Sequence, residues 1–238
     1  MISAFLDTNV LLGITETDLL LSLSETGGML RPYWSEYVFD ELKEHLPERL
    51  EESGSEDAFR KACRRIDAMR YAFPESMVPA SKWELYSSIA EKYVNDLDDT
   101  QILAGAIACN ADCLVTDNLK DFDIKGIQRL FGISTTSTDM FLQTVFHCHP
   151  TVFWDSAEKM VGRHNKPPQT LEELSNILKD HGRTGIASDM EAEARKRQIT
   201  SLPRVSQHQG RDSLGRFTAI QGDDSDLFDV WGPNGNGY

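Results

Sequence analysis

Short apolar runs alternate with amphipathic stretches through residues 1–148 of this chain. Residues 2–7 (ISAFLD) are an apolar run that ends at Asp7 and passes directly into a helical pattern. Residues 113–116 and 133–134 are further short apolar runs beside helical segments, and residues 77–79 are a fourth candidate strand. Helices that alternate with such strands are typical of βαβ units. The pattern therefore predicts an α/β fold with a mainly parallel sheet.

The predicted helices have apolar positions spaced at 3.6 residues. One covers residues 34–50, with Ser35 as its candidate N-cap. A second covers residues 58–72 and is strongly basic. A third starts at Asp98 or Asp99 and ends at Asn110, and a fourth covers residues 125–132.

The character of the chain changes after residue 148. Residues 149–198 predict a small helical appendage, with helices over 156–162, 171–182 and 189–197. Residues 199–238 are rich in Gly, Gln, Ser and Asp and contain few core residues, so we expect a disordered tail. The expected organisation is an α/β domain over 1–148, the appendage over 149–198 and the tail over 199–238.

Charge and composition exclude several classes of protein. The chain has 24 Lys and Arg against 38 Asp and Glu, a net charge of −14, which is the opposite of a broad nucleic-acid-binding face. It has no apolar run of about 18 residues, which a membrane span needs, and it begins without a basic, cleavable leader. Its four cysteines form no CxxC pair. We expect a reduced, cytoplasmic protein.

Acidic residues recur where predicted strands end or helices begin. Asp7 and Asp117 end apolar runs, Asp99 opens a helix on its core-facing stripe, and Glu41 lies beside the apolar face of the helix over 34–50. Each has an ordinary alternative: Asp7 and Asp99 as helix caps, Glu41 as a solvated helix edge, and Asp117 as a turn residue. Only in combination do these residues indicate a shared site.

Open α/β sheets carry their chemistry at the carboxyl ends of strands. Several ionised carboxylates gathered there would repel one another and raise one another's pKa values. A divalent cation removes this conflict, and an all-oxygen ligand set selects Mg²⁺ or Mn²⁺. Such an ion would bind a scissile phosphate and lower the pKa of a bound water. The pattern therefore favours a metal-dependent phosphodiesterase.

Three segments carry a resemblance to a known family. They are FLDTNVLL, SEYVFDEL and DLDDTQILAGAIACNADCLVTDNLKDF, in that order. Together they resemble the PIN-domain ribonucleases, in particular bacterial VapC-like toxins. The third segment is the most specific, because an acid opens an Ala-rich helix that leads to Ala-Asp, an apolar strand and Thr-x-Asn-Leu-x-Asp-Phe.

The resemblance implies roles for individual residues. Asp7, Glu41 and Asp99 match the first three acids of the family. Asp117 is carried as the fourth catalytic position, and Asp7, Asp99 and Asp117 as metal ligands. Asn118 and Asp121 are the alternatives for the fourth position. Asn9 and Thr116 are the expected supporting residues.

The resemblance also implies a fold, a reaction and partners. It extends into residues 157–182, which are similar to a helical appendage found in one VapC-like subgroup, and so covers residues 1–185. It implies a three-layer α/β/α sandwich, Mg²⁺-dependent endoribonuclease activity, frequent dimerisation and inhibition by an antitoxin.

Other enzyme classes fit less well. The first strand lacks the Asp-x-Asp of haloacid dehalogenase phosphatases, and the chain lacks P-loop, dinucleotide-binding and Gly-x-Ser-x-Gly motifs. The main alternative is a PIN-fold RNA- or partner-binding module with weak or lost activity. A stand-alone housekeeping or defence nuclease is an alternative to a toxin.

An acidic nuclease needs a local way to hold RNA. We predict a basic strip beside the site on the helix over 58–72, although a solvated amphipathic face is an equal alternative. Its residues are Arg60, Lys61, Arg64 and Arg65.

Overall fold

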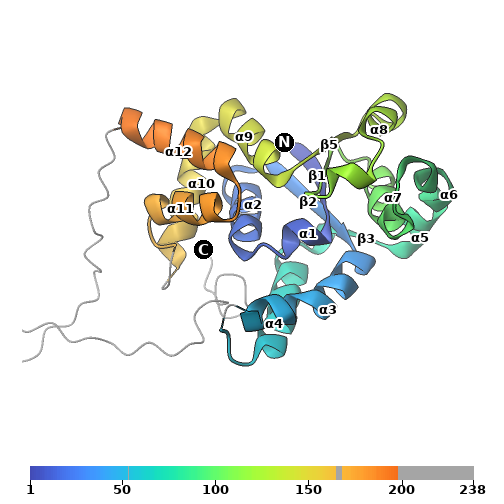
Figure 1. Cartoon of the computed structure of the whole chain (residues 1–238), viewed down its shortest axis with the longest axis horizontal. Coiled ribbons are helices and arrows are strands. Elements are labelled where there is room, and N and C mark those ends of the chain that lie inside the picture. The colour runs from blue at the N-terminus through green and yellow to red at the C-terminus, as the bar shows by residue number, and fades with distance from the viewer. Residues whose placement is uncertain (53, 165–167, 198–238) are drawn as a thin grey trace, which may run out of the picture.

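The computed structural model describes residues 1–52, 54–164 and 168–197 of the chain (Figure 1). Its sheet has five strands, all parallel, in the order β3-β2-β1-β4-β5. The strands are β1 (Ile2–Leu6), β2 (Leu30–Ser35), β3 (Met77–Val78), β4 (Cys113–Val115) and β5 (Ser134–Thr136). The predicted tail over 199–238 lies outside the described residues.

Helices connect the strands and follow the sheet. The α-helices are α1 (Thr8–Leu11), α2 (Ile14–Gly27), α3 (Glu36–Glu52), α4 (Ala58–Ala72), α5 (Ala80–Trp83), α6 (Ser87–Ala90), α7 (Thr100–Ala108), α8 (Ile124–Phe131), α9 (Thr138–Cys148), α10 (Pro150–Arg163), α11 (Leu171–Asp180) and α12 (Thr184–Arg197). Single 3₁₀ turns are η1 (Pro74–Ser76), η2 (Glu84–Tyr86), η3 (Glu91–Tyr93), η4 (Leu97–Asp99) and η5 (Leu119–Asp121).

Strand β1 lies at the centre of the sheet, between β2 and β4. The chain builds β1, β2 and β3 outward in one direction and then crosses back to add β4 and β5 on the other side. The carboxyl ends of β1 and β4 are therefore neighbours where the strand order reverses, the usual ligand position in such sheets. Their register pairs Leu6 with Val115, and the Asp7 N–H donates to the Val115 carbonyl at 3.1 Å.

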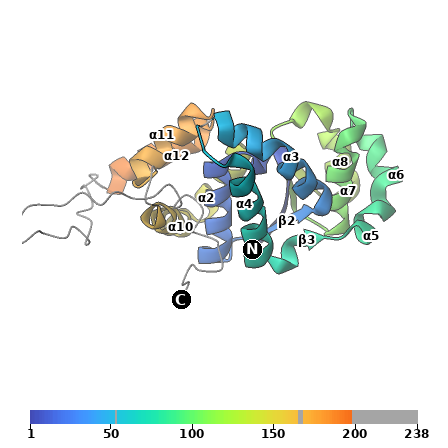
Figure 2. The ribbon, with the colours of Figure 1, turned by 90° about the horizontal axis from the view of Figure 1, so that it is seen from below.

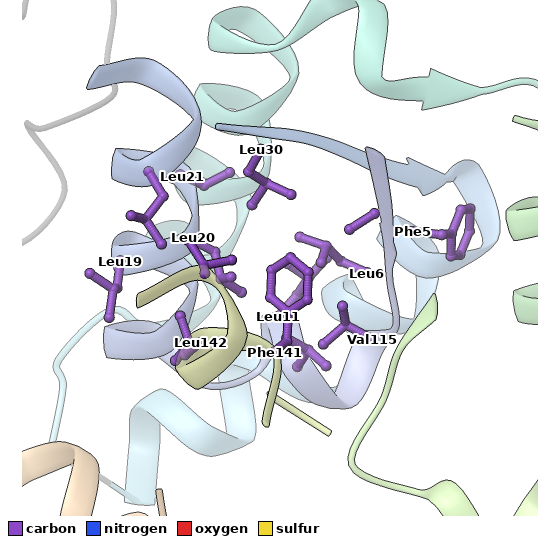
Figure 3. Packing of buried hydrophobic residues seen from close by; sticks show 14 of the residues in the cluster. Phe5, Leu6, Leu11, Leu19, Leu20, Leu21, Leu30, Val115, Phe141 and Leu142 are labelled. Atoms are coloured by element: carbon purple, nitrogen blue, oxygen red, sulfur yellow. The ribbon is translucent and has the colours of Figure 1, made fainter. Parts of the chain in front are cut away.

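Helices cover both faces of the sheet, which makes the α/β/α arrangement that was predicted. Figure 3 shows Leu6 directed toward Leu20 of α2 and Leu142 of α9, and Phe5 directed to the opposite side, as successive strand residues must be. Helix α7 covers the Phe5 side. A Cβ added to its Gly105 would lie 2.5 Å from the Phe5 ring, so only glycine allows this close approach.

The C-terminal helices pack beside α2, at the opposite end of the molecule from α7 and α8 (Figure 2). Phe153 and Trp154 of α10 and Leu174 and Leu178 of α11 are fully buried in the same apolar cluster as β1 and α2. The appendage therefore shares one core with the α/β part.

Strand β2 was not predicted from sequence. Its Pro32 has no N–H for a ladder, but β3 pairs only with Trp34 and Ser35, so Pro32 lies beyond the end of that pairing. The helix expected from residue 34 begins at Glu36. Ser35 accepts a hydrogen bond from the Val38 N–H at 3.4 Å, as its capping role requires.

Among the described residues, no helix combines the length and the apolar character needed to cross a bilayer.

Candidate functional site

Asp7 lies at the carboxyl end of β1, where it is almost fully buried. It occupies the N-cap position of α1, but its side chain makes no capping hydrogen bond. Instead its Oδ2 accepts from the Thr116 hydroxyl and from the Asn9 amide, each at 2.6 Å. The Asn9 amide also donates to Thr116 Oγ1, at 3.1 Å. Asn9 and Thr116 thus orient the Asp7 carboxylate.

Glu41 reaches the same edge from α3. Its Oε2 accepts a hydrogen bond from the Thr8 hydroxyl at 2.5 Å, one residue beyond Asp7. Tyr37, one turn earlier on α3, also bonds to Glu41, and burial and the Glu41 charge raise the pKa of its hydroxyl. Glu41 is therefore partly buried, and these contacts direct its carboxylate toward the site. The sequence prediction did not include Tyr37, although its position four residues before Glu41 is the signal that could have found it.

Asp99 ends η4 and leads into α7. Partial burial, and then the charges of Asp7, Asp121, Asp96 and Glu41, raise its pKa to about 7. For Asp7, burial is the largest cause of a pKa raised to about 6, with the Glu41 charge adding to it and hydrogen bonds from Thr116 and Asn9 opposing it. Asp7, Glu41 and Asp99 are thus brought within electrostatic range of one another.

Asp117 and Asp121, two of the residues predicted for the fourth position, lie in different surroundings. The side chain of Asp117 turns toward α9 and the appendage, where it accepts from the Thr138 N–H at 3.0 Å and from its hydroxyl at 3.2 Å. Its Oδ2 also pairs with Arg183 at 2.6 Å. Asp121, at the end of η5, is instead one of the charges that raise the pKa of Asp99.

Two backbone N–H groups of the turn at Asp117 donate hydrogen bonds to Asn9 and Thr116, the residues that orient Asp7. The Asp117 N–H donates to Asn9 Oδ1 at 3.0 Å, and the Asn118 N–H donates to Thr116 Oγ1 at 3.1 Å. The segment after β4 therefore contributes to the site through its backbone.

The predicted basic strip on α4 is incomplete. Arg65 is buried and donates to Asp18 at 2.7 Å and to the Ile14 carbonyl at 3.2 Å, so it is not a surface residue that could contact RNA. Its inclusion was wrong because it lies on the apolar side of the helix. Arg60 is exposed and pairs with Asp57 at 2.7 Å, and the Lys61 ammonium bonds to the Ser55 hydroxyl at 2.7 Å.

The acidic edge offers a metal ion carboxylates from separate segments of the chain. Within residues 1–52, 54–164 and 168–197, no three His, Cys, Asp or Glu side chains form a ready-made metal-binding group. The raised pKa values of Asp7 and Asp99 nevertheless show that anionic carboxylates are unfavourable here without a compensating charge. Asp7, Asp99 and the acids that act on them offer only oxygen ligands. This suits Mg²⁺, which keeps several of its waters and needs only one or two carboxylates.

Comparisons of this chain with protein-family models, curated proteins and solved structures found no match.

Proposed function

We propose that this protein is a Mg²⁺- or Mn²⁺-dependent endoribonuclease that hydrolyses RNA phosphodiester bonds. The observation that carries the proposal is the pair of carboxylates at the carboxyl edge of β1, Asp7 and Asp99, whose pKa values are raised to about 6 and about 7. Strongly perturbed acids that converge from distant segments are typical of functional sites. The resemblance to PIN-domain ribonucleases supplies the substrate class.

Asp7 and Asp99 would hold the metal ion, with the Glu41 carboxylate beside them. When bound, a divalent ion supplies Lewis acidity toward the scissile phosphate and toward an attacking water. Asp121 is the better candidate for the fourth position, since its charge acts on Asp99, whereas Asp117 already pairs with Arg183.

The remaining roles belong to the chain's own side chains. Thr116 and Asn9 fix the orientation of Asp7, while Thr8 and Tyr37 fix that of Glu41. Pre-organised carboxylates of this kind need no rearrangement at the moment of reaction.

The test is cleavage of a mixed RNA pool with Mg²⁺, with Mn²⁺ and with EDTA. The variants are Asp7→Asn, Glu41→Gln and Asp99→Asn, and the control is Asp40→Asn. Asp40 lies beside Glu41 on α3 but is exposed and pairs with Lys43. We expect wild type and control to cut only with a divalent ion, and each site variant to be about 100-fold slower or worse. Wild-type rates in Asp7→Asn and Asp99→Asn would refute the assignment.

The second candidate is a PIN-fold module that binds RNA or a partner with little or no activity. The observation that favours it is the lack of a ready-made three-ligand group in the described part of the chain. Such a module would bind RNA equally well in EDTA and in Mg²⁺ and leave it intact. The cleavage assay separates the two candidates directly.

The biological role proposed is that of a cytoplasmic toxin of the VapBC type, held inactive by an antitoxin and able to form a homodimer. A stand-alone housekeeping or defence nuclease is the alternative. A small gene beside this one, whose product binds the protein and stops cleavage, would support the toxin role. Absence of such a gene product would favour the stand-alone nuclease.

A further inference from the structure

The turn between α11 and α12 is bound by acids from the α/β part. Glu16 of α2 is almost completely buried, yet it faces two basic side chains of this turn. His181 Nδ1 lies 3.1 Å from Glu16 Oε1, and Arg183 Nε donates to the same oxygen at 3.2 Å. The other end of the Arg183 guanidinium pairs with Asp117. Arg183 therefore bridges a buried anchor on α2 and the segment that follows β4.

A third acid fixes where the turn lies. Asp139 of α9 accepts hydrogen bonds from the N–H groups of Gly185 and Ile186, at 3.0 and 2.9 Å, in the first turn of α12. A Cβ on Gly185 would lie 2.7 Å from the Asp139 carboxylate and nearer still to the Gln143 amide, so a larger residue here would displace these side chains. Glu16 and Asp117 thus hold the Arg183 side chain, and Asp139 holds the backbone that follows it.

From Arg183 a continuous set of contacts leads to Asp7. Arg183 and Thr138 hold the Asp117 side chain, which leaves the Asp117 N–H directed at Asn9 Oδ1. Asn9 then presents its amide to the Asp7 carboxylate. Every contact in the series is a hydrogen bond or ion pair between 2.6 and 3.2 Å.

We propose that Arg183 is a positioning residue for the acidic site, so that the C-terminal helices complete the site and do not merely cap the fold. By fixing Asp117, Arg183 fixes the backbone N–H that orients Asn9, and through Asn9 it orients Asp7. The part that concerns metal affinity rests on the proposed function; the part that concerns the Asp117 backbone does not.

The alternative is a stabilising ion pair with no effect on the site. Arg183→Gln breaks the pairs with both Asp117 and Glu16, so loss of stability alone does not distinguish the two. Glu16→Gln is the matched variant, because it weakens the same anchor on α2 and leaves the Asp117 pair in place. Arg163→Gln is the second control. It breaks the 2.7 Å pair between the appendage and Glu25, away from Asp117.

The first measurement is Mn²⁺ affinity of the full chain, followed by the electron paramagnetic resonance signal of free Mn²⁺. Outer-shell partners of metal ligands typically change metal affinity about 10- to 100-fold. We expect Arg183→Gln to weaken Mn²⁺ binding at least about 10-fold, in line with that range. Arg183→Lys should restore part of the loss, and Glu16→Gln and Arg163→Gln should stay near wild type. Unchanged affinity in a folded Arg183→Gln protein would overturn the proposal.

The second measurement needs no metal. Amide hydrogen exchange at Asp117 and Asn118 should be faster in Arg183→Gln than in Glu16→Gln. Equal exchange in the two variants would overturn the proposal even if Mn²⁺ binds. If wild type binds no Mn²⁺, the metal-dependent function fails, and this exchange result alone decides the positioning role. Should Arg183→Gln not fold, Asp117→Asn replaces it, since it breaks the same ion pair and keeps that with Glu16.

Discussion

Individual carboxylates at the edge of β1 are held at an energetic cost. Burial is the main cause for Asp7, and for Asp99 partial burial acts together with four neighbouring acids. Both pKa values lie above the ordinary 3.8, so the folded protein binds protons more readily than the unfolded chain. Stability from these groups is therefore complete below about pH 4 and is lost as the pH rises through 6 and 7.

This cost predicts how Asp7→Asn changes stability. The asparagine oxygen can still accept from Thr116 and Asn9, while the buried charge is gone. Without metal at pH 8, we expect the variant to be more stable than wild type by roughly 1–4 kcal/mol, the value of a shift of about two pKa units. Denaturant unfolding at pH 5 and pH 8 measures this. The gain should shrink at pH 5, and the same gain at both pH values would show that the Asp7 charge is not its origin.

The buried pair between Arg65 and Asp18 gives a second prediction for single residues. Arg65→Ala leaves the Asp18 carboxylate buried with its principal partner removed, which typically costs about 3–5 kcal/mol. Arg60→Ala removes only an exposed pair on the same helix and should change stability by less than about 1 kcal/mol. Thermal unfolding of the two variants compares them. Equal, small effects would mean that Arg65 and Asp18 do not form the buried ion pair described above.

At the scale of elements, the close contact of α7 with β1 sets where Asp99 lies, because Asp99 directly precedes α7. Gly105→Ala places a methyl group against Phe5, and overpacking of this kind costs about 1–3 kcal/mol. Phe5→Leu in the same chain should recover part of that loss. A double-mutant cycle of unfolding free energies measures the coupling. Additive effects would contradict the tight packing of α7 on β1.

Prediction of the elements from sequence succeeded where local periodicity was clear. The basic helix α4 was predicted at its observed bounds, and the short strand β3 and the helix–strand pair after residue 124 were also predicted. Helix α2 was not predicted, because even Glu16, Thr17 and Asp18 are buried in it along with its leucines. A helix buried on most sides lacks the polar stripe on which such predictions depend.

The site was predictable only in part, because some of its side chains are placed by contacts with distant segments. Asp7 lies at a strand end and Asp99 at a helix start, which sequence patterns mark, whereas Glu41 lies inside α3 and was found through the family resemblance. The direction of Asp117 depends on Arg183, and that pairing comes from how the appendage packs on α2. The burial of Arg65 likewise depends on Asp18, a partner on another helix. Contacts between distant segments leave no local signal in a single sequence.

At the scale of the whole molecule, the sheet order brings the ends of β1 and β4 together while α3, α7 and the appendage supply residues around them. The net charge of −14 surrounds this edge with a field that repels RNA and attracts cations. A divalent ion at the site would oppose both the local and the overall repulsion. The central claim is thus that the carboxylates of Asp7 and Asp99 together bind one.

Calorimetric titration of the full chain with Mn²⁺ at pH 7.5 tests this claim most directly. The account predicts saturable binding by wild type and by Asp40→Asn, weakened at least about 10-fold in both Asp7→Asn and Asp99→Asn, as loss of a ligand requires. Binding of Mn²⁺ that is equal in all four proteins, or absent from wild type, would contradict it.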